Sequence, residues 1–157
     1  MSDLRVGIGV DAHALADGVP LVLGGVVLDH PRGLAGHSDG DVLAHALIDA
    51  ILGAAGLGDT GSLFPSGDER FAGADSVDLL RRAYNAAREA GWSLVNADCV
   101  LVGEEPRIAE HRDTMRRRLS EALGGGEVNV RATTTDHLGF TGRGEGLAAQ
   151  AVALLSR

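Results

Sequence analysis

The sequence predicts a single α/β domain that spans residues 1–157. The length suits one hydrophobic core and is short for two. Hydrophobic residues make up 45% of the chain and charged residues 23%, which is typical of a globular protein that fills a core. Segments in which apolar residues alternate are interspersed with segments in which they recur at helical spacing, so both strands and helices are expected.

The first part of the chain is expected to form two strands and a helix. Apolar residues alternate with glycines over 4–10, which predicts a strand with one nearly bare face. A second strand is expected at 21–28, where two glycines permit a bulge or a close backbone approach. Ser38 is a good helix cap, and the apolar spacing after it predicts a helix that ends at Gly56.

The rest of the chain is expected to form a long loop and five further elements. Residues 59–73 are rich in Gly, Pro and Asp, so they predict a loop, and loops of this length are typical of functional segments. The predicted elements are a helix at 76–90, a strand at 94–102, a helix beginning at Pro106, a strand at 127–133 and a short helix of small residues at 146–155.

The charge pattern narrows the possible partners. The chain has 14 basic and 22 acidic residues, and its formal net charge of −8 disfavours nucleic-acid binding. Every basic residue is arginine, which excludes a P-loop lysine and a Schiff-base lysine. Phosphate groups would therefore have to be bound by arginine, backbone N–H groups or metal ions.

Three features favour a cytoplasmic location without a membrane partner. No apolar run approaches the roughly 18 residues needed to cross a bilayer. The N-terminal residues lack the apolar segment of a signal peptide. Cys99 is the one cysteine, so it cannot form a disulfide within the chain.

Two histidines and an aspartate are candidate ligands of a catalytic metal site. Asp11 and His13 are two residues apart in extended chain, so their side chains point to the same side. His45 lies in the first predicted helix. Together these groups suit Zn²⁺ and leave a fourth position open, as in catalytic zinc sites. A surface aspartate beside a hydrogen-bonded histidine is the alternative interpretation of Asp11 and His13.

A polar stripe is predicted on the same helix. Asp41, His45 and Asp49 recur every four residues, which places them along one helix face. The two carboxylates would flank the His45 ring and support a metal-bound imidazole. A solvated helix face is the alternative.

Hydroxyl groups and an arginine near the C-terminus form a candidate phosphate site. Residues 133–136 read Thr-Thr-Thr-Asp, and Arg143 lies in the glycine-rich turn 141–146. These groups can bind phosphate oxygens without a lysine. The pattern is not that of a P-loop nucleotide site. A strand edge followed by a tight turn is the alternative.

Together the three regions resemble the 2-C-methyl-D-erythritol 2,4-cyclodiphosphate synthase family of the non-mevalonate isoprenoid pathway. The similar stretches are GVDAHALADG, AGHSDGDVLAHALIDAILGAAGLGDTGSLFP and RATTTDHLGFTGRGEG, in the order of the family. The resemblance runs through essentially the whole chain, and the HSDGDV and TGRGEG blocks are highly specific. It implies a mixed four-stranded sheet covered by helices on one face, an N-terminal β-hairpin, and a homotrimer with active sites between subunits.

The resemblance implies a reaction and the residues that perform it. In the family, the 2-phosphate of 4-diphosphocytidyl-2-C-methyl-D-erythritol 2-phosphate attacks the β-phosphate of the same molecule, which closes the cyclic diphosphate and releases CMP. By resemblance, Asp11, His13 and His45 bind a zinc ion. Asp136, where many members have glutamate, is implied to hold a second cation, Mg²⁺ or Mn²⁺. Thr134 and Asp136 are the implied catalytic residues.

Two binding regions are also implied by the resemblance. The implied substrate-binding residues are Asp11, His13, His37, Ser38, Asp49, Asp59, Gly61, Phe64, Thr133, Thr134, Phe140 and Arg143. The residues implied for the cytidine nucleotide are Glu104, Glu105, Pro106, Arg107 and Ile108, with arginine at 107 where lysine is common.

Two other functions fit part of the pattern. A zinc phosphohydrolase also uses Asp-x-His and a distant His, and it would release inorganic phosphate instead of CMP. A non-catalytic trimeric module that binds an isoprenoid diphosphate would keep its ligand affinity after replacement of His45 by alanine. A synthase would instead lose turnover.

Overall fold

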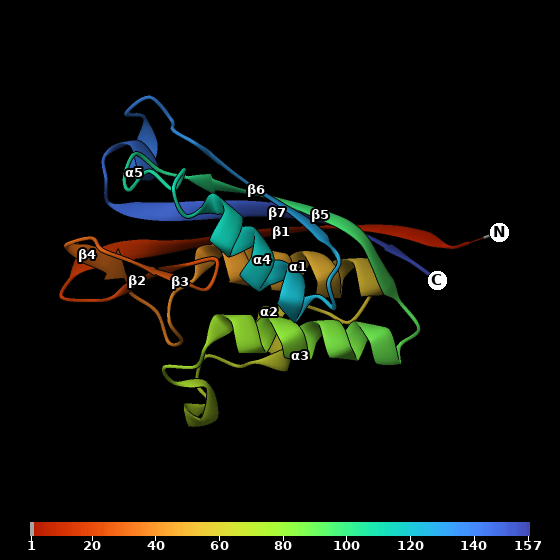
Figure 1. Cartoon of the computed structure of the whole chain (residues 1–157). Helices are drawn as coiled ribbons and strands as arrows, with labels where there is room; N and C mark the ends of the chain where they lie inside the picture. The colour runs from red at the N-terminus through yellow and green to blue at the C-terminus, as the bar shows by residue number, and fades with distance from the viewer. Residues whose placement is uncertain (1) are drawn as a thin grey trace.

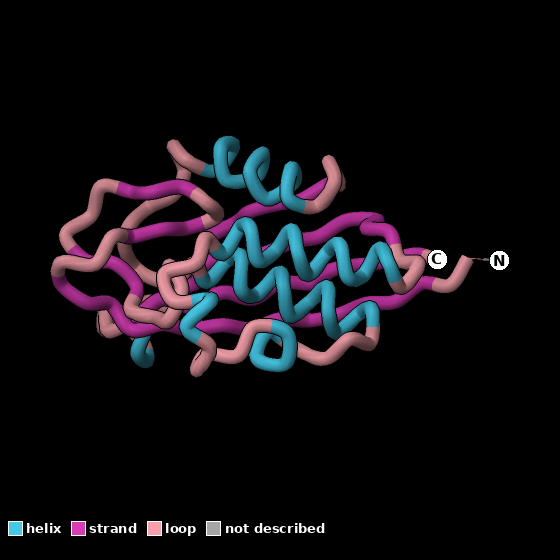
Figure 2. Tube along the Cα trace, turned by 90° about the horizontal axis from the view of Figure 1, so that it is seen from below, coloured by secondary structure: helices cyan, strands magenta, loops and turns pink. Residues whose placement is uncertain are grey.

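The computed structural model describes residues 2–157, and its long helices cover one face of a mixed β-sheet (Figure 1). The elements are β1 (Leu4–Asp17), β2 (Leu21–Leu23), β3 (Val26–Leu28), β4 (Arg32–Leu34), α1 (Val42–Ala55), α2 (Thr60–Leu63), the 3-10 helix η1 (Glu69–Phe71), α3 (Ser76–Glu89), β5 (Ser93–Val102), α4 (Arg112–Ala122), β6 (Glu127–Thr133), α5 (Gly139–Gly142) and β7 (Gly146–Ser156). Helices α1 and α3 lie side by side along the strands (Figure 2). Within residues 2–157, no helix has the length and apolar character needed to cross a membrane.

The sheet has the expected mixed character. The long strands β1, β7, β5 and β6 are neighbours in that order; β5 and β6 are parallel, and the other pairs are antiparallel. The short β4 adds a strand beside β1, and β2 and β3 form a separate hairpin. The prediction of a single strand at 21–28 is therefore wrong, because the chain turns at Gly24 and Gly25, which both have positive φ. The parallel pair ends at one edge of the sheet, with Val102 opposite Thr133. In sheets with parallel strands, ligands often bind at such carboxyl ends.

Helix α1 lies against β1 because two strand positions lack a side chain. A Cβ atom at Gly7 would lie 1.9 Å from the Ala50 carbonyl oxygen, and one at Gly9 would lie 1.8 Å from that of Ala46. Strand β7 beside β1 buries alanine at three alternate positions, which also leaves room for the helix. This close approach brings His45, the residue before Ala46, up to the strand that carries Asp11 and His13.

The start of α1 differs from the prediction. The helix begins at Val42, and its cap is Asp41, whose side chain accepts a hydrogen bond from the Ala44 N–H. Asp41 is fully buried, and its carboxylate also accepts hydrogen bonds from the Gly24 and Gly25 N–H groups, at 2.9 and 2.8 Å, which offset the cost of burying it. The prediction that Ser38 caps the helix is therefore wrong, whereas the predicted end at Gly56 is confirmed.

The last segment is a strand, and the prediction of a helix at 146–155 is wrong. Strand β7 pairs with β1 on one side and with β5 on the other. Its burial alternates: Ala151 and Ala153 are buried, while Gln150 and Val152 are exposed. The small residues have high helix propensity, but two neighbouring strands supply the backbone hydrogen bonds, and tertiary pairing overrides the local preference.

Other predicted elements hold with adjusted ends. The predicted strand at 4–10 extends to Asp17, and the predicted helix at 76–90 and the strands at 94–102 and 127–133 are present. The third predicted helix is present, but it begins at Arg112, so the prediction that it begins at Pro106 is wrong. The expected loop at 59–73 contains two short helical turns, α2 and η1.

The buried carboxylate of Asp41 predicts a pH-dependent stability. Burial raises its pKa to about 6, against the opposing effect of three N–H donors. The folded state therefore holds this proton more tightly than the unfolded chain, where the ordinary value is 3.8. The free energy of unfolding therefore decreases as the pH rises from the unfolded-state pKa of Asp41, 3.8, through its folded-state pKa of about 6.

We expect the free energy of unfolding of the wild type, relative to that of Asp41→Asn, to fall between about pH 4.5 and about pH 7.5 by on the order of 2 kcal/mol. Asparagine does not titrate, so the variant serves as the reference. Urea denaturation of both proteins in the presence of a metal chelator measures the difference. A difference that is independent of pH would contradict this account.

Candidate metal centre

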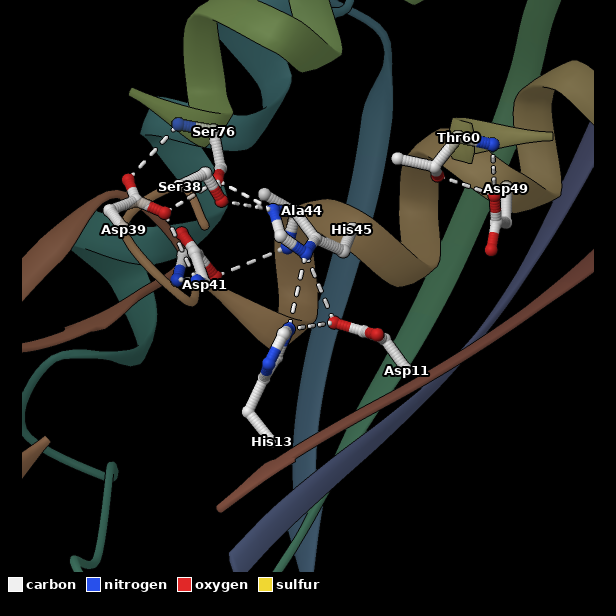
Figure 3. A network of polar contacts seen from close by, with 11 residues as sticks. Asp11, His13, Ser38, Asp39, Asp41, Ala44, His45, Asp49, Thr60 and Ser76 are labelled. Atoms are coloured by element: carbon white, nitrogen blue, oxygen red, sulfur yellow. Dashed lines mark hydrogen bonds and ion pairs between the residues drawn. The ribbon is translucent and has the colours of Figure 1, made fainter. Parts of the chain in front are cut away.

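Three ligand atoms from β1 and α1 converge on one point (Figure 3). Asp11 Oδ2 lies 2.9 Å from His13 Nε2 and 3.1 Å from His45 Nδ1. The two imidazole nitrogens are 3.5 Å apart. The predicted side-by-side placement of Asp11 and His13, and the contribution of His45 from the helix, are therefore confirmed as a cluster that can hold a metal ion.

The donor set and its spacing fit a single metal ion. An ion bound tetrahedrally at about 2.1 Å separates neighbouring ligand atoms by roughly 3.4 Å, and the observed separations lie close to that value. Burial opposes ionisation of Asp11, but its hydrogen bonds to His13 and His45, together with the charges of these rings, lower the pKa of Asp11 to about 2. The hydrogen bond with Asp11 in turn raises the pKa of His13. The carboxylate is thus ionised near neutral pH, as a metal ligand requires.

Two hydroxyl groups contact the far side of the His45 ring. His45 Nε2 lies 2.7 Å from Ser76 Oγ and 3.0 Å from Ser38 Oγ. Ser76 in turn donates to Asp39, through both its hydroxyl and its backbone N–H. Neither Ser76 nor Asp39 was predicted as a site residue, because no local spacing links the start of α3 to the loop before α1.

The carboxylates of Asp41 and Asp49 have other partners. Asp41 holds the hairpin at Gly24 and Gly25. Asp49 accepts hydrogen bonds from the backbone N–H and the hydroxyl of Thr60, which anchors α2 to α1. The prediction that these two carboxylates flank the His45 ring is therefore wrong.

A cavity of about 260 Å³ adjoins the three ligands. It is lined by Asp11, His13, His37, Ser38, His45, Thr60, Gly61, Phe64, Ser66, Phe71 and Leu79. Phe64 and Phe71 pack edge to face with their ring centroids 5.3 Å apart. Asp59 is exposed at the start of α2 and accepts hydrogen bonds from Ser62. The structure thus gathers His37, Ser38, Gly61 and Phe64 beside the metal ligands and adds an apolar wall.

A second cavity, of about 200 Å³, lies at the carboxyl ends of β5 and β6. It is lined by Gly103, Glu104, Pro106, Arg107, Ile108, Ala109, Arg112, Ala132, Thr133 and Thr134. Most residues predicted for the nucleotide therefore lie together with the two threonines predicted to contact phosphate. Ile108 is buried, whereas Arg107 is exposed.

Asp136 lies in a turn next to this second cavity. Asp136 and His137 both have positive φ, at 51° and 66°. Glu104 accepts a hydrogen bond of 2.8 Å from the His137 N–H, which ties the turn to the end of β5. Asp136 is exposed, and its Oδ1 lies 3.3 Å from Thr134 Oγ1. The turn therefore presents the exposed Asp136 carboxylate beside the threonines.

Two of the remaining predicted residues line a third cavity, of about 220 Å³. Glu105 and Arg143 line it together with Arg32 and His137. Arg143 also forms an exposed ion pair with Glu145. Phe140 is 43% exposed in α5.

The first two cavities lie on different parts of the sheet. In the strand register, Ala12 faces Ala148, Ala148 faces Val102, and Val102 faces Thr133. Thr133 is thus three strands away from the residue between Asp11 and His13, or roughly 14 Å at the usual strand spacing. The metal ligands and the threonines therefore belong to two separate regions of one chain.

Comparison with known proteins identifies relatives over the whole chain. The model of the YgbB family matches residues 4–156. The 2-C-methyl-D-erythritol 2,4-cyclodiphosphate synthase of Rubrobacter xylanophilus is 59% identical, and the match covers 100% of this chain and 98% of that protein. The bifunctional IspDF from Campylobacter jejuni has a TM-score of 0.95 and 42% identity, over 99% of this chain and 43% of that one. A solved 2C-methyl-D-erythritol-2,4-cyclodiphosphate synthase in a CDP-bound form has a TM-score of 0.86 and 37% identity, over 96% of this chain and 99% of that one.

Proposed function

The chain belongs to the YgbB family, and we propose that it converts 4-diphosphocytidyl-2-C-methyl-D-erythritol 2-phosphate to 2-C-methyl-D-erythritol 2,4-cyclodiphosphate. An oxygen of the 2-phosphate attacks the β-phosphorus, and the bond from that phosphorus to the bridging oxygen breaks. CMP leaves with the bridging oxygen, and no water is consumed. The observation that carries this proposal is the convergence of Asp11, His13 and His45 beside a cavity.

The residues around the first cavity hold and orient the methylerythritol end of the substrate. Zinc held by Asp11, His13 and His45 would supply Lewis-acid polarisation of a phosphate oxygen. His37 and Ser38 offer polar contacts to the substrate hydroxyl groups. The Phe64 and Phe71 side chains on the apolar wall exclude water, which strengthens the electrostatic contacts in the site.

The second cavity binds the cytidine diphosphate part of the substrate. Arg107 provides positive charge there, which suits a diphosphate in a chain without lysine. The hydroxyl groups of Thr133 and Thr134 donate hydrogen bonds to phosphate oxygens. Asp136 would hold a second cation, Mg²⁺ or Mn²⁺. Phosphoryl transfer depends mainly on such positioning and charge neutralisation.

A homotrimer would bring the first cavity of one chain next to the second cavity of a neighbouring chain. Leu4, Val6, Ile8 and Val10 of β1 lie on the sheet face opposite α1 and are exposed, Val6 by 69% and Ile8 by 68%. An apolar strand face of this kind favours burial against other chains. Light scattering during size exclusion tests this assembly: a mass of three chains is expected, and a monomer would contradict it.

The assay that tests the proposed reaction follows both products. Purified protein with zinc and Mg²⁺ is expected to release one CMP for each cyclic diphosphate formed, as read by phosphorus NMR. Simple phosphomonoesters serve as the comparison substrate. Release of inorganic phosphate from them, without cyclic product, would favour a zinc phosphohydrolase instead.

Asp136→Asn is expected to lower turnover at least about tenfold and to raise the Mg²⁺ concentration needed for half-maximal activity, because removing the charge weakens cation binding. Titration of Mg²⁺ in the CMP assay measures both effects. Asp113→Asn is the matched control, since this aspartate lies on α4 and its side chain is 90% exposed. An unchanged Mg²⁺ dependence in Asp136→Asn would remove Asp136 from the second cation site.

A further inference from the structure

A chain of polar groups runs from the metal centre to the loop before α1 (Figure 3). His45 Nδ1 faces Asp11 and His13, while Nε2 on the other side of the ring contacts Ser76 Oγ at 2.7 Å. The Ser76 hydroxyl donates to Asp39 Oδ1, and the Ser76 N–H donates to Asp39 Oδ2 at 3.0 Å. The hydrogen-bonded groups therefore follow in the order metal ligands, His45 imidazole, Ser76 hydroxyl and Asp39 carboxylate.

The chemistry of these groups sets the direction of each hydrogen bond. An ionised carboxylate can only accept, so the Ser76 hydroxyl gives its proton to Asp39. Because its one proton is given to Asp39, Ser76 Oγ can only accept from His45 Nε2. A neutral imidazole with its proton on Nε2 has a free lone pair on Nδ1, the nitrogen that faces Asp11 and His13.

We propose that Ser76 and Asp39 are positioning residues that fix the His45 tautomer and ring orientation, so that Nδ1 is the metal-binding nitrogen. The proposal deepens the proposed function, because it requires a metal ion at the three ligands. It does not require turnover. Outer partners of this kind hold a ligating histidine in place and raise its affinity for the metal.

The Ser76 hydroxyl is available for this role because it does not cap a helix. Helix α3 is capped by Asp75, whose side chain accepts from the Val77 N–H. Ser76 itself is fully buried, so its hydroxyl is not held by bulk solvent. The carboxylate of Asp39 is fixed by a further donor, the Asp41 N–H, at 3.0 Å. Ser76 and Asp39 are thus both held in one geometry before a metal binds.

Ser38 offers a matched comparison on the same ring nitrogen. Its hydroxyl lies 3.0 Å from His45 Nε2, slightly farther than that of Ser76. Its other contact in the described part of the chain is the Ser76 hydroxyl at 3.2 Å, and it has no carboxylate partner there. Only the Ser76 hydroxyl is therefore polarised directly by a negative charge.

The test measures the zinc affinity of the full chain by competition with a chromogenic chelator. Ser76→Ala is expected to weaken zinc binding about 10–100-fold, and Ser38→Ala by less than about threefold. The visible absorption of the Co²⁺-loaded protein should shift in Ser76→Ala, since the orientation of the His45 ring changes. The thermal midpoint of the metal-free proteins checks that each variant folds.

Asp39→Asn is the second variant, because it keeps the size of the side chain and removes its charge. We expect weaker zinc binding by at least about fivefold. Wild-type affinity in both Ser76→Ala and Asp39→Asn would overturn the proposal, as would an equal loss in Ser38→Ala. A wild-type protein that binds zinc but releases no CMP would instead overturn the proposed reaction and leave the positioning role in place.

Discussion

Replacing His45 with alanine is expected to abolish stoichiometric zinc binding and to lower CMP release at least about a hundredfold. His45 supplies one of three ligand atoms at the centre, and Asp11 and His13 alone form an incomplete site. Removing only an outer partner of a zinc ligand already costs about 10–100-fold, so loss of the ligand itself should cost more. Metal analysis by mass spectrometry and the CMP assay measure the two effects on the same protein sample.

His111→Ala is the control for this prediction. His111 lies at the start of α4, where its side chain makes no capping hydrogen bond, and it is not part of the metal cluster. It is expected to keep one zinc ion per chain. A His45→Ala protein that retains both zinc and turnover would exclude the metal centre described above. A non-catalytic binding module would give a different result. The wild type would release no CMP, and His45→Ala would still bind an isoprenoid diphosphate.

Gly9→Ala is expected to destabilise the protein by about 3 kcal/mol or more. The new Cβ would lie 1.8 Å from the Ala46 carbonyl oxygen and 2.9 Å from the Ala50 backbone nitrogen. These are backbone atoms in the middle of α1, so no rotamer change can relieve the contact, and the helix must move away from β1. Urea denaturation of the metal-free protein measures the loss. Zinc affinity should fall as well, because Ala46 follows His45.

Gly53→Ala is the matched control on the helix itself. A Cβ at Gly53 would meet no atom within 4 Å, and this glycine lies in the last turns of α1. Alanine has higher helix propensity than glycine, so the variant should be more stable by about 0.5–1 kcal/mol. A Gly9→Ala protein as stable as the wild type would show that the contact between α1 and β1 tolerates a side chain.

The metal centre could be predicted from the sequence because local geometry determines most of it. Two residues separated by one position in a strand point to the same side, which places Asp11 beside His13 whatever the rest of the fold does. The bare glycine face of the same strand also indicated where another element could approach. The position of His45 followed from the helical spacing of its neighbours.

The parts that sequence reasoning missed depend on contacts between distant segments. The residues of β7 favour a helix by composition, and only pairing with β1 and β5 makes them a strand. The residues that support His45 are Asp39 and Ser76, which are 37 positions apart in the sequence. Asp41 looked like a member of a polar stripe, but its partners are in the hairpin turn. No periodicity within one helix carries this information.

A crystal structure of the zinc-loaded protein, with anomalous data collected at the zinc edge, would locate the metal ion. We expect one strong anomalous peak per chain, within about 2.0–2.2 Å of Asp11 Oδ2, His13 Nε2 and His45 Nδ1. A peak bound elsewhere, or three side chains that point away from a common centre in the presence of zinc, would contradict it.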